Sequence, residues 1–185
     1  MGVVTANVRA ERGVLSYPRV DLADCPIGFV KAQHAFLRDV VAALGALARG
    51  DQEARASSIY EILCAELGRT LQDRRANLIP VLARRAEPDD EIDRLIETLR
   101  TEYRAIEAEI EPLAHALDAG SFTWHRSLAD PAGRLALHLR QTVAVESSVL
   151  IPLMRVRLAA SDYELLTAAF RARRENLANL PVEAG

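Results

Sequence analysis

Six polar side chains are expected near mid-height on the inner faces of four predicted helices: His34, Thr70, Arg74, Tyr103, Thr142 and Glu146. Their neighbours at helical spacing are apolar, so each one interrupts an apolar stripe. Thr70 and Arg74 are four residues apart, as are Thr142 and Glu146, and residues at this spacing can serve one site together. A polar layer inside a helical bundle is typical of metal ligands, or of an ion pair in their place.

The two spaced pairs belong to an internal repeat. Residues 70–82 read TLQDRRANLIPVL and residues 142–154 read TVAVESSVLIPLM, with Leu-Ile-Pro in register. Four positions after the threonine the copies differ in sign, with Arg74 in the first and Glu146 in the second. A repeated helix in a short chain predicts two helical hairpins packed as a pseudo-symmetric bundle. Arg74 and Glu146 would then face each other across the core, and Pro80 should bend its helix.

Helical periodicity predicts the elements that hold these residues. Apolar positions with a 3.6-residue period indicate long helices over about 26–48, 53–85, 89–117 and 131–158, and a short fifth helix over 161–178. The connections are short or moderate, which predicts an all-α, up-down-up-down four-helix bundle over residues 26–160. Residues 1–25 are expected to form an extended N-terminal arm that packs on the bundle. Residues 179–185 are expected to form a disordered tail.

Residues with strong positional preferences mark the predicted helix ends. Asp24, just before Pro26, predicts the N-cap of the first helix. Acidic residues from Asp89 onward favour the start of the third helix, because they complement the positive end of its dipole. Asp130 followed by Pro131 predicts the start of the fourth helix.

Composition restricts the class of protein. The chain has 185 residues and a net charge of −3, which fits one domain with a sizeable core and gives no general attraction to nucleic acid. We recognise no signal peptide and no apolar run long enough to span a bilayer, so we expect a cytoplasmic protein that does not bind membranes. Cys25 and Cys64 lack metal-type spacing and are expected to be reduced thiols, with Cys64 in the core.

The order of these features over residues 26–158 resembles the hemerythrin-like family, also called HHE cation-binding domains. The features are an inward His34, the LIPVL stretch of the second helix, the TEYRAIE stretch of the third and the ESSVLIPL stretch of the fourth. The resemblance implies a four-helix bundle in which two helix pairs carry a non-haem di-iron centre. Its ligands would be one histidine on each of the first and third helices, and one His-x-x-x-Glu pair on each of the others.

This chain departs from that ligand pattern at most of its positions. Thr70 and Thr142 stand where the paired histidines would be, Arg74 where the first pair's glutamate would be, and Tyr103 where the third-helix histidine would be; His34 and Glu146 match. Threonine hydroxyls are poor iron ligands, and an arginine cation repels a metal ion. A di-iron centre of the family type, and any other cofactor, is therefore not expected.

An ion pair is the expected replacement for the metal. Without a metal ion or an ion pair, Glu146 would carry an uncompensated buried charge, which is strongly unfavourable. Arg74 would supply the opposite charge and bind Glu146 in a bidentate way, with the other polar residues of the layer satisfying the remaining groups. The predicted function is a non-enzymatic regulatory or interaction module that binds another protein or itself, with a homo-oligomer as one form.

Two other functions stay open. A displaced ligand set could bind iron for oxygen or redox sensing, and its members would be His34, Glu66, Glu107, His138 and Glu146. A small-ligand pocket could open where the metals would have been.

The remaining polar groups have ordinary interpretations. His115 and His125, near a helix end and in a loop, are expected to be solvated. Arg171, Arg173 and Arg174 are expected to form a solvated face, with contact to an acidic partner as the alternative.

Overall fold

The structure is a computed structural model that describes residues 25–49, 59, 61–118 and 126–178. Within these residues it contains helices and connecting turns but no strand, so the all-α prediction is confirmed. The predicted arm over residues 1–24 and the tail over 179–185 lie outside the described residues. None of the described helices is both long enough and apolar enough to cross a membrane.

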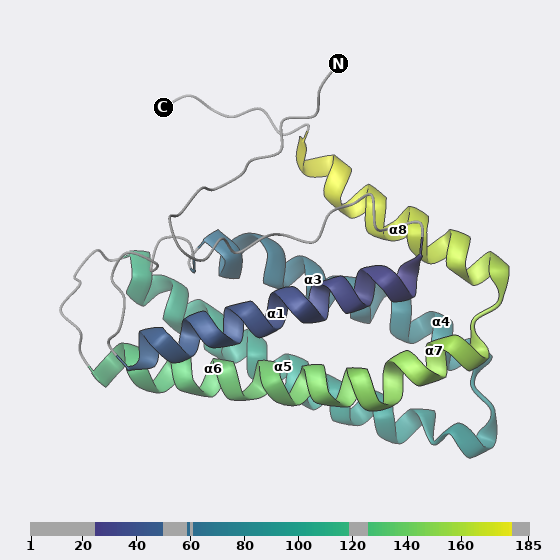
Figure 1. The fold of residues 1–185 in the computed structure, drawn as a ribbon, viewed down its shortest axis with the longest axis horizontal. Coiled ribbons are helices and arrows are strands. Elements are labelled where there is room, and N and C mark those ends of the chain that lie inside the picture. Colours follow the sequence, from purple (N-terminus) through teal and green to yellow (C-terminus); the bar gives the residue numbers. More distant parts are fainter. Residues whose placement is uncertain (1–24, 50–58, 60, 119–125, 179–185) are drawn as a thin grey trace.

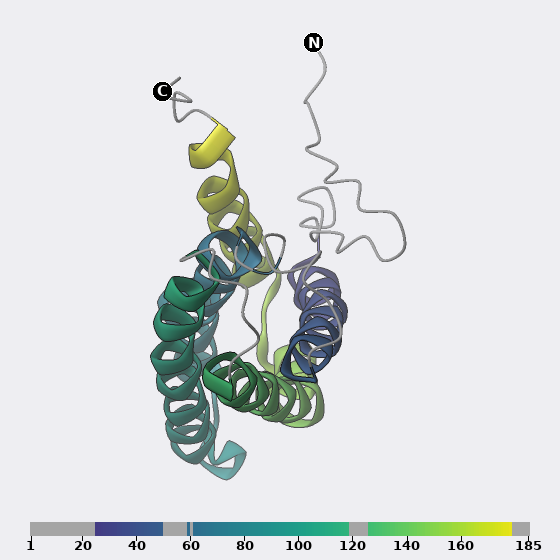
Figure 2. The same ribbon diagram turned by 90° about the vertical axis from the view of Figure 1, so that its left-hand side faces the viewer.

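Four helical segments pack around one core. They are α1 (Pro26–Ala48); η3 (Leu63–Leu67), α3 (Gly68–Gln72), η4 (Asp73–Leu78) and α4 (Ile79–Arg85) in succession; α5 (Ile92–Asp118); and α6 (Arg126–Val145) continued by η6 (Glu146–Leu150) and α7 (Ile151–Arg157). α6 packs against both α1 and α5. Figure 2, an end-on view, shows the four segments around a common interior. The last helix, α8 (Ala160–Ala178), packs on η4 and α1 (Figure 1).

The predicted apolar stripes fill the interior of this bundle. Leu44, Leu99 and Leu139, from three different helices, have no exposed surface. Burial of one such side chain stabilises the fold by about 1.5–3 kcal/mol. α8 joins the core through Phe170, whose ring centroid lies 5.3 Å from that of Phe29 on α1. The fifth helix is therefore packed on the bundle, and polar residues of α8 lie against the bundle surface.

The internal repeat reappears as repeated secondary structure. In both copies a π-helical stretch (η4 and η6) leads into a seven-residue α-helix (α4 and α7). The N–H of Ile79 donates to the carbonyl of Arg74, and that of Ile151 to Glu146, five residues earlier. Each α-helix has a proline at its second position, and this proline lacks the N–H that an α-helical register needs. The proline therefore accompanies the change from π-helical to α-helical register in both copies.

Two ion pairs join the copies reciprocally. Arg85, the last residue of α4, binds Asp162 through Nε–Oδ2 and Nη2–Oδ1 contacts of 2.8 and 3.2 Å. Arg157, the last residue of α7, binds Asp90 through the equivalent contacts of 2.8 and 3.0 Å. Each aspartate also accepts the backbone N–H three residues before it. The arginine of each copy thus binds the aspartate that follows the other copy, as a pseudo-symmetric pairing of the two hairpins requires.

One predicted N-cap and two predicted helix starts are wrong. The N-cap of α1 is Cys25, whose Sγ accepts the N–H of Gly28 at 3.4 Å. The third helix begins at Ile92, after a 3-10 turn, η5 (Pro88–Asp90), and Glu91 in the left-handed region with φ of 47°. The fourth begins at Arg126, so Pro131 lies inside it. A proline has a helical φ and removes only one hydrogen bond, so a helix can extend before it when packing favours that.

Candidate functional site

Glu146 lies at the centre of the polar layer. Its Oε2 accepts hydrogen bonds from Nε2 of His34 at 2.6 Å and from Nε of Arg74 at 3.0 Å. Its Oε1 accepts one from the hydroxyl of Tyr103 at 2.7 Å. The four residues come from η6, α1, η4 and α5, and none is more than 2% exposed. The interior of the bundle therefore contains the expected Arg74–Glu146 ion pair, with two further donors on the same carboxylate.

The surroundings of Glu146 keep its carboxylate ionised. Burial alone would raise its pKa, but the charge of Arg74 and the hydrogen bonds from His34 and Tyr103 outweigh burial and lower the pKa to about 2. For Tyr103 burial acts with the negative charge of Glu146, so the pKa of the phenol lies well above its ordinary value. Burial opposes the charge of Arg74, but the carboxylate of Glu146 prevails and raises the pKa of the guanidinium. All three groups thus keep the charge states that their hydrogen bonds need.

Glu146 is expected to make the fold acid-sensitive. Its pKa is about 2 in the folded protein against an ordinary value of 4.5, so its ionisation favours the folded state. This contribution, about 3 kcal/mol, is complete above pH 4.5 and is lost as the pH falls toward 2. Urea unfolding between pH 7 and pH 2.5 should show a steeper loss of stability for the wild type than for Glu146→Gln. Equal pH dependence of the two proteins would contradict this assignment.

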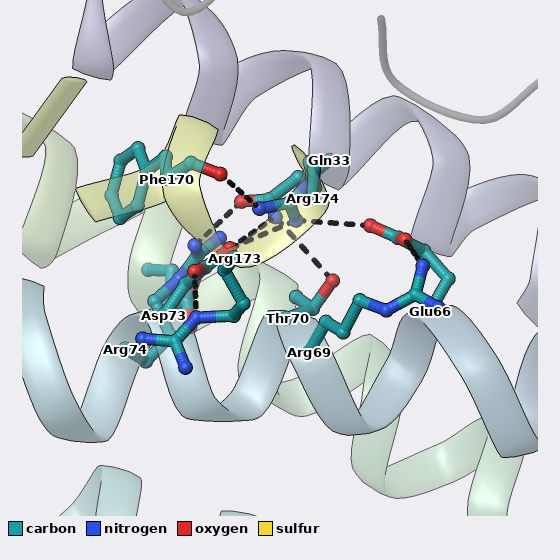
Figure 3. Close-up of polar contacts among 10 residues, drawn as sticks. Gln33, Glu66, Arg69, Thr70, Asp73, Arg74, Phe170, Arg173 and Arg174 are labelled. Carbon is teal, nitrogen blue, oxygen red and sulfur yellow. Dashed lines mark hydrogen bonds and ion pairs between the residues drawn. The ribbon is translucent and has the colours of Figure 1, made fainter. Parts of the chain in front are cut away.

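Gln33 connects the centre of the site to a second polar cluster. Its Oε1 accepts from Nη1 of Arg74 at 2.6 Å. Its Nε2 donates to Oδ2 of Asp73 at 3.2 Å and to the hydroxyl of Thr70 at 3.4 Å (Figure 3). Gln33 and Asp73 have no exposed surface. One side-chain amide thus lies between the guanidinium of Arg74 and the carboxylate of Asp73, and it forms a hydrogen bond with each.

Two arginines of α8 complete the second cluster. Nε of Arg173 donates to Oδ1 of Asp73 at 2.8 Å, and Nη2 of Arg174 lies 2.9 Å from Oδ2 of Asp73 and 3.0 Å from Oε1 of Glu66 (Figure 3). The guanidinium of Arg174 also lies over the ring of Phe29, 4.5 Å from its centroid. The prediction of a solvated arginine face is therefore wrong for these two residues, because buried carboxylates on the second helix bind them.

The interior charges balance within the two clusters. Three arginines and three carboxylates take part: Arg74, Arg173 and Arg174 with Glu146, Asp73 and Glu66. Burial raises the pKa of Glu66 even though Arg174 and Arg69 oppose it. Buried charges are tolerated when each has an opposite partner and hydrogen bonds. Removal of any one of these groups is therefore expected to leave an uncompensated charge.

Two details of the expected ion pair are wrong. Arg74 does not bind Glu146 in a bidentate way: Nε donates to it and Nη1 donates to Gln33, while Nη2 has no hydrogen-bond partner among the described residues. Thr142 is buried, but its hydroxyl likewise has no partner there. The reason is geometric, since His34 and Arg74 share one oxygen of the carboxylate and Tyr103 takes the other.

The displaced ligand set does not come together. His34 and Glu146 are in contact. The other three have separate partners: Glu66 binds Arg174, Glu107 binds Arg75 at an exposed position, and His138 binds Glu102. Among the described residues, no group of three or more His, Cys, Asp or Glu side chains is placed to hold a metal ion. His115 and Cys25 are exposed, whereas His125 and the side chain of Cys64 lie outside the description.

The residues present do not fit a di-iron centre. The guanidinium of Arg74 hydrogen-bonds the carboxylate that would have to bind metal, and Nε2 of His34 donates to the same oxygen. A ligating imidazole must instead offer a lone pair, and a guanidinium has none to offer. This arrangement of donors does not suit a metal ion.

Ser147, His34 and Glu146 form a hydrogen-bonded chain that sequence reasoning missed. The hydroxyl of Ser147 lies 3.1 Å from Nδ1 of His34, and Nε2 of His34 binds Glu146. The order of groups is that of a serine hydrolase triad, but the two ring nitrogens are exchanged, because in a triad the serine binds Nε2 and the carboxylate binds Nδ1. Two further features separate it from a triad. Arg74 shares the Glu146 oxygen with His34, and Ser147 lies inside η6, where helical hydrogen bonds engage the backbone N–H groups that an oxyanion hole needs.

The molecule is thus defined as an all-helical bundle with a buried, charge-balanced ion-pair network. No protein-family model, no curated protein and no solved structure matches the chain.

Proposed function

We propose that this chain is a non-enzymatic regulatory or interaction module, built on a hemerythrin-like four-helix bundle in which an ion-pair network replaces the metal. The observation that carries the proposal is the carboxylate of Glu146. Its oxygens accept three donors, from Arg74, His34 and Tyr103, so the only acidic ligand position that the chain retains is already engaged. A function left to such a bundle resides on its surface, with another protein, a second copy or a small ligand as partner. We place it in the cytoplasm.

Metal content is the first test of this proposal. Untagged protein, expressed in iron-supplemented medium, is expected to be colourless and to contain far less than stoichiometric iron, manganese or zinc by elemental analysis. The metal content of an Arg74→Glu variant is measured alongside it. This variant has an acidic residue at the ligand position of the hemerythrin-like family and serves as the comparison for adventitious metal binding. Near-stoichiometric metal in the wild-type protein, with charge-transfer absorption, would refute the proposal and favour a displaced iron site.

Reactivity of Ser147 is the second test. We expect a fluorophosphonate probe, which labels activated serines, to leave the protein unmodified, because the helical hydrogen bonds of η6 engage the backbone N–H groups around Ser147 and Arg74 weakens the support that Glu146 gives His34. Ser148 provides a matched control, since its hydroxyl donates to the carbonyl of Ala144 within the helix. Labelling that is lost in Ser147→Ala but kept in Ser148→Ala would overturn the non-enzymatic assignment and identify a hydrolase-like site.

A further inference from the structure

A hollow lies at the Ser147–His34 contact and is lined by residues of α1 and of the η6–α7 segment. Its volume is about 290 Å³. Three of its lining residues are cations, Lys31, Arg38 and Arg155, and the buried His34 and the exposed Ser147 form part of its wall. The hollow therefore brings the buried His34 next to an open, positively charged surface.

A second hollow of about 430 Å³ continues from the first along α1 and α6. The two share Arg38 and Ser147, so they are neighbours, and we call them together the groove. The second has a different chemistry, because Val41, Val143 and Ala144 line it and Arg140 is its only other cation. The groove thus has one strongly cationic end and one mainly apolar end. Its volumes are in the range of pockets that hold small molecules.

The cations of the groove are available to a ligand. Lys31, Arg38, Arg140 and Arg155 are all exposed, and no carboxylate among the described residues forms an ion pair with any of them. No acidic residue lines either hollow. This local excess of positive charge stands out in a chain whose net charge is −3. A symmetric contact with a second copy would place these cations against one another, so charge complementarity favours an anion.

We propose that this groove binds a small amphiphilic anion, an apolar chain or ring system that carries a carboxylate or phosphate. The anionic group lies between Lys31 and Arg155, beside Ser147, and the apolar part lies along Val143 and Ala144. The inference rests on the proposed function and names its ligand class, since a regulatory module needs a signal to bind. The contact of Ser147 with His34 joins this ligand site to the Glu146 network.

Calorimetric titration of the untagged, full chain tests the proposal. Decanoate below its micelle concentration is expected to bind, whereas acetate, which lacks the chain, and decylammonium, which has the opposite charge, are not. The double substitution Lys31→Gln with Arg155→Gln should weaken decanoate binding by about tenfold or more, because both cations contact the head group. Ala144→Phe, at an exposed position, should weaken it by filling the apolar end. Arg100→Gln, an exposed arginine on α5, should leave it unchanged.

Four results would overturn the inference: no decanoate binding, equal binding of decylammonium, unchanged affinity in the groove variants, or binding of anionic phospholipid vesicles without binding of monomeric decanoate. The last result would indicate a lipid-surface site instead of a pocket. None of these depends on metal content or on serine labelling, so the ligand inference can fail while the metal-free, non-enzymatic module stands. Conversely, a metal-bound protein would refute the proposed function whatever decanoate does.

Discussion

Replacement of Arg74 by alanine is expected to lower the free energy of unfolding by about 3–5 kcal/mol, because it leaves the buried carboxylate of Glu146 without its positive partner. The same change removes the donor to Oε1 of Gln33, a second buried polar atom. His34 and Tyr103 would still donate to Glu146, but neither supplies the permanent positive charge of a guanidinium. Urea unfolding at pH 7, with circular dichroism as the readout, measures the loss.

Arg75 is the matched control for this substitution. It is the next residue in the chain, but its side chain is 35% exposed and its partner Glu107 is 47% exposed. Arg75→Ala should cost no more than about 1–2 kcal/mol, because it removes this surface ion pair and the contact of the guanidinium with the ring of Tyr103, 5.6 Å from its centroid. Should Arg74→Ala cost no more than Arg75→Ala, the Arg74–Glu146 pair would not be a main support of the fold.

A double substitution separates lost charge from lost packing. Arg74→Met combined with Glu146→Leu removes both charges and keeps most of the apolar volume, so it should be more stable than Arg74→Ala alone. The recovery is expected to be partial, because the hydroxyl of Tyr103 and the N–H of His34 would lose their acceptor. A double variant as unstable as Arg74→Ala would show that side-chain packing, and not charge, dominates at this position.

The parts of the fold that the sequence predicts are those with strong periodicity. α1 has the predicted bounds, and Tyr103 points inward from the middle of α5 as its stripe indicates. The repeat of Leu-Ile-Pro also predicts the meeting of Arg74 and Glu146, because two copies of one helix in a bundle face each other. These inferences depend on spacing alone, which a sequence shows directly.

The second polar cluster could not be predicted in the same way. Asp73 precedes Arg74, and in a regular α-helix two neighbours point in directions about 100° apart. The π-helical register of η4 alters that geometry, and both side chains are buried. The Leu-Ile-Pro motif gives one indication, because its proline lacks the N–H that a regular α-helix needs. A sequence does not show, however, whether the helix responds by bending or by adopting a wider, π-helical hydrogen-bond pattern.

The role of α8 depended on tertiary packing that no local pattern shows. Three arginines near the end of a surface helix are usually solvated, and only the docking of Phe170 against Phe29 brings Arg173 and Arg174 to the carboxylates of Asp73 and Glu66. The sequence around Asp73 does not show that this residue is buried, because the arginines that bind it lie far along the chain, on α8. The last helix thus supplies two of the charges that balance the interior.

Removal of those two charges is expected to have the second large effect. Arg173→Ala combined with Arg174→Ala leaves Asp73, which has no exposed surface, with Gln33 as its remaining donor. Of the partners that the structure describes, Glu66 would keep only Arg69, at 3.3 Å. We expect a loss of about 3–5 kcal/mol in the free energy of unfolding, as for other broken buried pairs. Glu175→Ala, an exposed position on the same helix, is the control and should change stability by less than about 0.5 kcal/mol.

Rescue by neutral isosteres decides whether charge causes this loss. Asp73→Asn and Glu66→Gln, added to the double alanine variant, remove the uncompensated charges but keep the side-chain volumes, so most of the lost stability should return. Limited proteolysis adds a local readout, since α8 should become cleavable in the double alanine variant before the rest of the bundle does. If the isosteres restore nothing and cleavage of α8 is unchanged, the arginines act through the packing of their apolar stems on Phe29 and Phe170, and the charge balance across this interface is not what holds α8 to the bundle.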